Sequence, residues 1–83
     1  MKEYMEGVRY DTNKAEHIAS HWGTNHQEML YRTLKGHWVL VYEFKAPGTA
    51  MNPLTEAQAE SWMRDHQLMD ALDECFPGKV EDA

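Results

Sequence analysis

The sequence predicts a small α+β domain. We expect two β-hairpins in one antiparallel sheet, a short helix after the first hairpin, and two carboxy-terminal helices on the apolar face of the sheet. Turns that contain Gly7 and Gly36 lie between strand-forming residues and indicate the hairpins. Apolar residues at helical spacing within 55–76 indicate the terminal helices. At 83 residues, the chain has room for one domain, over 1–83, with a thin core.

The first hairpin and the short helix are predicted from residues 3–23. The stretch EYMEGVRYD places Gly7 at a tight turn, where glycine supplies the positive φ that the turn needs. Asn13 and Glu16 approximate a capping box, and Gly23 is placed to end a helix of about two to three turns. We therefore expect a helix between Asn13 and Gly23. Its apolar stripe consists of Ala15, Ile18, Ala19 and Trp22.

The second hairpin is predicted from QEMLYRTL (27–34) and HWVLVYEF (37–44), with Lys35-Gly36 as a two-residue turn. Counting outward from this turn pairs Thr33 with Trp38. Because side chains alternate with a period of two, a slip of one residue would exchange the two faces. We expect the apolar and aromatic face to be the core. This face carries Met29, Tyr31, Thr33, Trp38, Leu40, Tyr42 and Phe44.

The rest of the chain is predicted to be a loop followed by helices. Residues 45–53 contain two prolines and a glycine, so we expect a loop. Thr55 is the predicted N-cap of a capping box at the start of the next helix. We expect two helices joined near His66, although the periodicity leaves one long helix over 55–76 open. Residues 78–83 are expected to form a frayed tail.

The net charge of −6 lies entirely in the last third of the chain. Residues 1–50 carry six cations and six anions, whereas residues 51–83 carry two cations and eight acids. Direct nucleic-acid binding, which depends on Lys and Arg, is therefore not expected, and a basic partner is. One interpretation is a solvated helix face; the other is a surface that fits a groove built for phosphate. The candidate contacts are Glu56, Glu60, Asp65, Asp70, Asp73 and Glu74.

Three of the five histidines lie within ten residues and raise the question of a metal site. His17 and His21 would share one face of the predicted helix. Two imidazoles fall short of the three or four ligands that zinc sites take. His26 would need the chain to fold back, and a carboxylate would have to come from Glu16 or Glu28. We therefore expect no metal and no cofactor; a metal-dependent enzyme or sensor through the three histidines stays as an alternative.

The other chemistry-bearing residues predict no enzyme. Cys75 is the only cysteine, so the chain has no internal disulfide, and we expect a buried, inert thiol in a reducing cytoplasm. Ser20 and Ser61 lack a nucleophile-elbow pattern, and the glycines are isolated turn residues. No run of about 18 apolar residues and no apolar segment near the amino terminus is present. The sequence thus predicts a cytoplasmic protein that neither spans a membrane nor carries a secretory signal.

Three stretches resemble a family of short, mostly uncharacterised proteins that phages and other mobile elements carry. Residues 7–19 contain its YDTxxAExI motif as YDTNKAEHI, and residues 28–40 contain LYRTxxG as LYRTLKG. Residues 52–63 contain PLTxxxAxxW as PLTEAQAESW. The resemblance covers nearly the whole chain, but many relatives have glycine-rich insertions where the loops here are short. The histidines are not part of the family pattern.

The resemblance implies an accessory protein of a mobile element. Small acidic proteins of this kind often inhibit host defence, anti-CRISPR proteins among them, and the step to this chain is by analogy. We predict a non-catalytic inhibitor whose acidic carboxy-terminal helices block a basic nucleic-acid-binding site, such as that of a CRISPR effector complex. The alternative is a module for protein interaction or homo-oligomerisation that uses the aromatic hairpin face, with the acids serving solubility.

Overall fold

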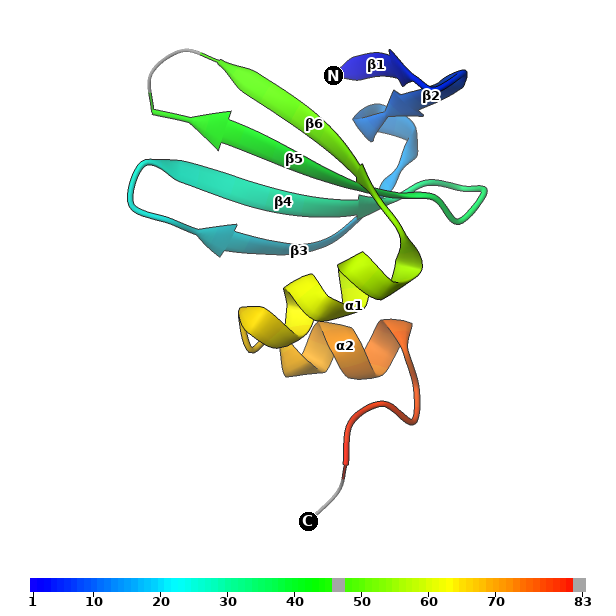
Figure 1. Cartoon of the computed structure of the whole chain (residues 1–83), viewed down its shortest axis with the longest axis vertical. Coiled ribbons are helices and arrows are strands. Elements are labelled where there is room, and N and C mark those ends of the chain that lie inside the picture. The colour runs from blue at the N-terminus through cyan, green and yellow to red at the C-terminus, as the bar shows by residue number, and fades with distance from the viewer. Residues whose placement is uncertain (46–47, 82–83) are drawn as a thin grey trace.

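The computed structural model describes residues 1–45 and 48–81 and has an α+β fold (Figure 1). In the described residues, the strands form a two-stranded and a four-stranded antiparallel sheet. The helices lie side by side on one side of the four-stranded sheet, and the two-stranded sheet lies away from them. The elements are β1 (Lys2–Met5), β2 (Val8–Asp11), the 3-10 turn η1 (Thr12–Lys14), β3 (Glu16–Trp22), β4 (His26–Arg32), β5 (Trp38–Phe44), β6 (Thr49–Leu54), α1 (Glu56–Asp65) and α2 (Met69–Cys75).

The first hairpin is confirmed. Strands β1 and β2 are antiparallel, and Met5 pairs with Val8 across a two-residue turn. Both turn residues have positive φ, 53° at Glu6 and 76° at Gly7, as a type I′ turn requires. The expectation of one shared sheet is wrong, because β1 and β2 form a sheet of their own.

The helix expected between Asn13 and Gly23 is also wrong, because most of this segment is strand β3. Strand β3 pairs with β4, and the register shifts between His17 and Ala19, so Ile18 is an extra, bulged residue. Ile18 and Ala19 both pack against the core. The bulge therefore puts two adjacent apolar residues on one side, and this breaks the strand period of two that the sequence would otherwise display.

The expected capping box of Asn13 and Glu16 is wrong, and the structure has a single 3-10 turn capped by Asp11 in its place. The carboxylate of Asp11 accepts a hydrogen bond of 3.0 Å from the backbone N–H of Asn13 and starts the single turn η1. Ala15 follows in an extended conformation, so the chain enters β3 directly. Gly23 lies in the turn between β3 and β4, where its N–H donates to the carbonyl of His26 at 2.8 Å.

The second hairpin is present, but its predicted register is wrong by one residue. Trp38 pairs with Arg32 instead of Thr33, and Leu30 pairs with Leu40. The loop spans residues 33–37, longer than the predicted Lys35-Gly36 turn, because Thr33 closes it. The Thr33 hydroxyl accepts from the His37 N–H at 3.0 Å, and the Thr33 N–H donates to the His37 carbonyl at 2.8 Å.

This slip changes which side of β4 is the core. Leu30 is fully buried together with Trp38 and Leu40, whereas Met29 and Tyr31 face the other side of the sheet. The predicted core face is therefore right for Trp38 and Leu40 in β5 and wrong for β4. A slip of one residue between two strands has this effect because side chains alternate.

The loop expected over 45–53 is wrong for its second half, where β6 runs antiparallel to β5. Strand β6 is an edge of the sheet, whose order is β3-β4-β5-β6. An edge strand tolerates Pro53, which has no N–H to donate, when that side of the strand has no partner. Residues 46–47 of the predicted loop lie outside the described residues.

Two terminal helices are present, as predicted, and the expected capping box is confirmed. The Thr55 hydroxyl accepts from the Gln58 N–H at 3.1 Å, and the Gln58 side chain accepts from the Thr55 N–H at 2.9 Å. Helix α1 ends at Asp65, with His66 as its C-cap, and Gln67 follows with a φ of 55°. The Gln67 and Leu68 N–H groups bond back to the carbonyls of Arg64 and Met63, which makes a Schellman motif.

The core lies between the four-stranded sheet and the helices. Trp38 of β5 stacks on Phe76 with ring centroids 5.6 Å apart. Beyond Phe76, the Arg64 guanidinium donates to the carbonyl of Lys79 at 2.8 Å, and Val80 packs partly buried on the core. Fraying of 78–83 stays a prediction, and 82–83 lie outside the described residues. The buried cluster consists of Leu30, Trp38, Leu40, Ala59, Trp62, Met63, Leu72 and Phe76.

Within residues 1–45 and 48–81, no helix has both the length and the apolar character that a membrane crossing requires. The longer helix, α1, has ten residues, and its exposed side carries charged side chains. A helix that crosses the hydrocarbon core of a bilayer needs about 20 apolar residues. The apolar side of α1 is instead used to cover the sheet.

Candidate functional site

The structure separates the three neighbouring histidines. His17 pairs with Tyr31, whereas His21 pairs with Glu28, and Tyr31 and Glu28 face opposite sides of β4. The bulge at Ile18 therefore turns His17 away from His21. The Nε2 atom of His17 lies 2.7 Å from the Ser20 hydroxyl, and its ring meets the Tyr31 ring edge-on. The three histidines considered from the sequence do not form one site.

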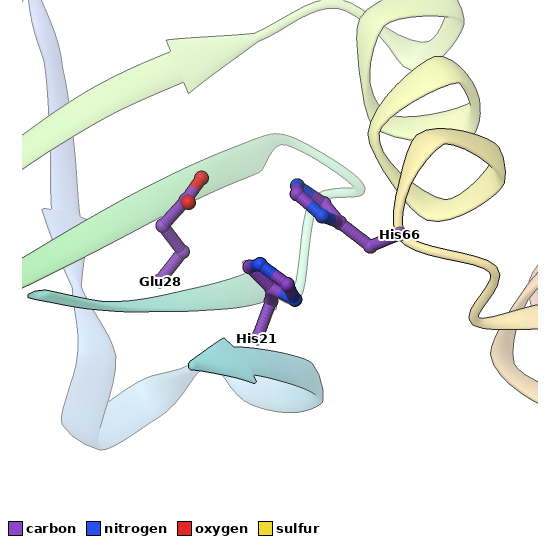
Figure 2. Close-up of side chains that lie close together, drawn as sticks. All are labelled: His21, Glu28 and His66. Carbon is purple, nitrogen blue, oxygen red and sulfur yellow. The ribbon is translucent and has the colours of Figure 1, made fainter. Parts of the chain in front are cut away.

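A different group of side chains does converge, at the junction of the sheet and the end of α1. His21 of β3, Glu28 of β4 and His66 after α1 each offer a ligand atom, and these atoms all lie within 4.8 Å of one another (Figure 2). We call these three residues the His-Glu-His cluster. All three side chains are half-buried. The cluster is the one such group of three or more among the described residues.

Each member of the cluster is positioned by secondary structure. His21 and Glu28 are directly opposite each other in the β3–β4 ladder, so their side chains leave the same face. His66 is the C-cap of α1 and is fixed by the Schellman motif at Gln67. The rings of His21 and His66 are stacked, with centroids 3.8 Å apart and planes 25° apart. Trp62, one turn before His66, meets the His66 ring edge-on at 5.1 Å.

The carboxylate of Glu28 has a hydrogen-bond partner on each oxygen. The indole N–H of Trp62 donates to Oε1 at 3.0 Å, and Nε2 of His26 lies 3.1 Å from Oε2. His26 is on the same sheet face as Glu28, two residues earlier in β4. These contacts hold the carboxylate beside the stacked rings of His21 and His66.

The electrostatics of the site favour the ionised form of Glu28. Burial raises the pKa of Glu28, but hydrogen bonds from Trp62 and His26 and the charges on His66 and His26 lower it by more, so the net shift is downward. Tyr42 shows the opposite effect. Burial and the charge of Glu28 raise the pKa of the Tyr42 phenol, which a hydrogen bond with Asn52 partly offsets.

The cluster has two chemical capacities. Two imidazoles and a carboxylate supply two nitrogen ligands and one oxygen ligand for a metal ion. The same groups can also share hydrogen bonds, since an imidazole nitrogen can donate or accept and a carboxylate accepts. Sequence reasoning did not assemble this site, because His66 is remote from His21 in the chain. The available signal was a polar side chain, His66, on the apolar stripe that Ala59, Trp62 and Met63 begin.

The six predicted contact residues lie on the helical layer but not all on one side. Glu60 forms an ion pair with Arg64, with 3.0 Å between Oε2 and Nε. Asp65 lines a shallow groove beside Trp62 and Glu28. The three acids of α2, Asp70, Asp73 and Glu74, are all exposed, as is Glu56 at the start of α1. Of the six acids, Glu60 alone has an ion pair among the described residues.

Cys75 is half-buried on the side of α2 that faces the sheet. Burial raises the pKa of its thiol, and the carboxylates of Glu16 and Glu74 add to this, against an opposing effect of Arg32. A raised thiol pKa leaves less thiolate at neutral pH, and the thiolate is the nucleophile. The environment of Cys75 is therefore the opposite of an activated catalytic cysteine.

The aromatic residues of the second hairpin are divided between core and surface. Trp38 is 5% exposed and is covered by the helices, so it has no free surface for a partner. Phe44, at the end of β5, is 44% exposed, and Trp22, at the end of β3, is 73% exposed. Trp22 and Phe44 line one small surface pocket together with His26.

Comparison of this chain with protein-family models, with curated proteins and with solved structures finds no match. Two features of the structure could carry a function. One is the set of exposed acids on the helices, and the other is the His-Glu-His cluster at the junction of the sheet and the end of α1.

Proposed function

We propose that this protein is a non-catalytic, protein-binding inhibitor from a phage or other mobile element. Its acidic helical surface mimics the charge of DNA and occupies a basic nucleic-acid-binding site, such as that of a CRISPR effector complex. The observation that carries the proposal is the surface of α2, where Asp70, Asp73 and Glu74 are exposed and no Lys or Arg is present.

The placement of these acids supports a binding role because it destabilises the free protein. Asp73 and Glu74 lie in the last turn of α2, which contains no basic residue. The negative end of the helix dipole disfavours carboxylates there, by about 0.3–1 kcal/mol each. Asp70 and Glu74 are also four residues apart, a spacing at which like charges repel. A basic partner would relieve both effects.

The helix also presents the charges in a fixed geometry. Leu72 is fully buried in the core, so the outward side of α2 is set relative to the sheet. Carboxylates held in this way need less ordering when a partner binds. Complementary charge would raise the association rate, and this rate would fall steeply with salt.

The test is a DNA-binding competition with a purified CRISPR effector complex. The variant with Asp70→Lys, Asp73→Lys and Glu74→Lys should lose the ability to displace DNA. The matched control, with Glu3→Lys, Glu6→Lys and Glu43→Lys, changes the net charge equally through exposed residues of the strands and the β1–β2 turn. It should keep the activity. If the α2 variant still displaced DNA in low salt, the proposal would be rejected. It would also be rejected if the native protein failed to displace DNA.

One observation favours a second candidate, a module for protein interaction or homo-oligomerisation. Trp22 is 73% exposed, and tryptophan side chains often dominate the energy of an interface. Light scattering after size-exclusion chromatography tests this candidate. A dimer that Trp22→Ala converts to a monomer would favour it, and a monomeric native protein would remove the homo-oligomer form. Trp38 is unsuitable for this test because it is buried in the core.

A further inference from the structure

We propose that the His-Glu-His cluster, His21, Glu28 and His66, is a binding site for a divalent transition-metal ion of the Zn²⁺ type. Its three ligands come from β3, β4 and the end of α1 and meet on one side of the sheet (Figure 2). The proposal is independent of the acidic surface on α2.

The distances fit an ion with small side-chain movements. Zinc binds nitrogen and oxygen ligands at about 2.0–2.2 Å, which at tetrahedral angles places two ligand atoms about 3.3 Å apart. The ligand atoms of His21, Glu28 and His66 lie within 4.8 Å of one another. Closing around an ion therefore needs each pair to approach by no more than about 1.5 Å. The rings of His21 and His66 are stacked, with centroids 3.8 Å apart, so both must turn for the in-plane lone pair of a nitrogen in each to face the ion.

The donor set selects the class of metal. Mg²⁺ and Ca²⁺ prefer oxygen ligands, so two imidazoles disfavour them. Imidazole suits Zn²⁺, Cu²⁺, Ni²⁺ and Fe²⁺, and the set of two histidines and a glutamate occurs in zinc sites that keep a fourth position for water. With three protein ligands, the cluster leaves one such position.

The hydrogen bonds to Glu28 are of the kind that orient the ligating side chains in known metal sites. Trp62 donates to one oxygen and His26 approaches the other, which orients the carboxylate. Each carboxylate oxygen has two lone-pair sites, so both can still accept a metal ion. The Glu28 side chain is 14% exposed, and no Lys or Arg among the described residues pairs with it. A charge partly removed from water is usually paired or bound to a metal, and a cation would add a charged partner beside Trp62 and His26.

The test is calorimetric titration of the full chain with Zn²⁺ at neutral pH, after treatment with a chelator. We expect one ion per chain. The variants His21→Gln, Glu28→Gln and His66→Gln should each weaken binding by more than about 100-fold, since each removes one ligand. His17→Gln is the matched control: it is the same substitution in the same strand but on the other sheet face, and it should change the affinity by less than about twofold.

A second measurement needs no variant, and it decides the matter if one of them fails to fold. Nuclear magnetic resonance of the native protein should show that Zn²⁺ shifts the ring signals of His21 and His66 and the indole N–H of Trp62. The ring signals of His17 and His37 should stay in place. Absence of binding, shifts confined to His17 or His37, or full retention of affinity in folded His66→Gln protein would each overturn the proposal.

Discussion

The side chain of Glu28 lies where two strands and a helix end meet, and its two donors differ in kind. The indole N–H of Trp62 does not titrate, so its hydrogen bond persists at every physiological pH. The Nε2 atom of His26 lies 3.1 Å from the other oxygen and donates to it in the tautomer that carries a hydrogen on Nε2. Glu28 therefore has one partner that is always a donor, Trp62, and one whose role depends on its tautomer, His26.

A prediction at the residue scale concerns Cys75. Burial and the nearby carboxylates raise the pKa of its thiol above that of a free cysteine. Alkylation by iodoacetamide should therefore be slower than for an unfolded control peptide, and its rate should level off only at a higher pH. The same shift predicts that the thiol's contribution to stability is present below its unfolded pKa and is lost as the pH rises through its folded pKa.

A pair of substitutions separates this effect from simple burial. Glu74→Gln removes a carboxylate that raises the pKa of Cys75, so it should speed alkylation. Asp73→Asn removes one negative charge from the same helix, at a residue that has no part in this shift. It should leave the alkylation rate nearly unchanged. Equal rates for the two variants at every pH would contradict the electrostatic account.

At the scale of the elements, the register of β4 against β5 has a direct energetic consequence. Leu30 is fully buried between the sheet and the helices, so Leu30→Ala should lower the free energy of unfolding by about 2–5 kcal/mol. Met29→Ala, on the other face and only half-buried, should cost clearly less. Leu34 is 90% exposed, and Leu34→Ala should have almost no effect. Urea unfolding measures all three, and the reverse order for Leu30 and Met29 would favour the register with Thr33 opposite Trp38.

The end of α1 gives a prediction of the opposite sign. Gln67 has a φ of 55°, which is a left-handed conformation. This conformation is unfavourable for a residue that has a Cβ atom, whereas glycine adopts it readily. Gln67→Gly should therefore raise the free energy of unfolding by up to about 1 kcal/mol. Gln67→Ala keeps the Cβ and should bring no such gain. Thermal unfolding of the two variants, with the native chain as reference, measures the difference.

Elements that depend on nearby residues could be predicted from the sequence, and elements that depend on distant residues could not. The capping box of Thr55 and Gln58 was predicted correctly because it depends on residues within one turn. Strand β3 was missed because the bulge at Ile18 removes the alternation that identifies a strand. The register of β4 and β5 was missed because Thr33 extends the loop through side-chain and backbone hydrogen bonds. The His-Glu-His cluster was missed because it is assembled from three elements, although His66 on the apolar stripe was visible.

At the scale of the whole molecule, the protein is elongated. Its extents are 43, 31 and 18 Å, and its radius of gyration of 13.1 Å exceeds the value of about 11.8 Å expected for a compact domain of this length. The main buried cluster lies in the layer between the four-stranded sheet and the helices, whereas Tyr10, Val39 and Val41 are buried outside this cluster. The exposed acids of α2 lie on the outer side of that layer, and the His-Glu-His cluster lies at its margin. A partner on the helices and an ion at the cluster would thus act on one structural unit.

The bulge at Ile18 has a further consequence, because β3 forms one outer rim of its sheet. A straight outer rim offers free backbone groups to which a neighbouring molecule can add its own strand. Pro53 blunts the opposite rim, and the extra residue in β3 interrupts this one. A chain that lacked Ile18 would present an even row of donors and acceptors, and we would expect it to self-associate and precipitate at concentrations where the native protein stays dispersed.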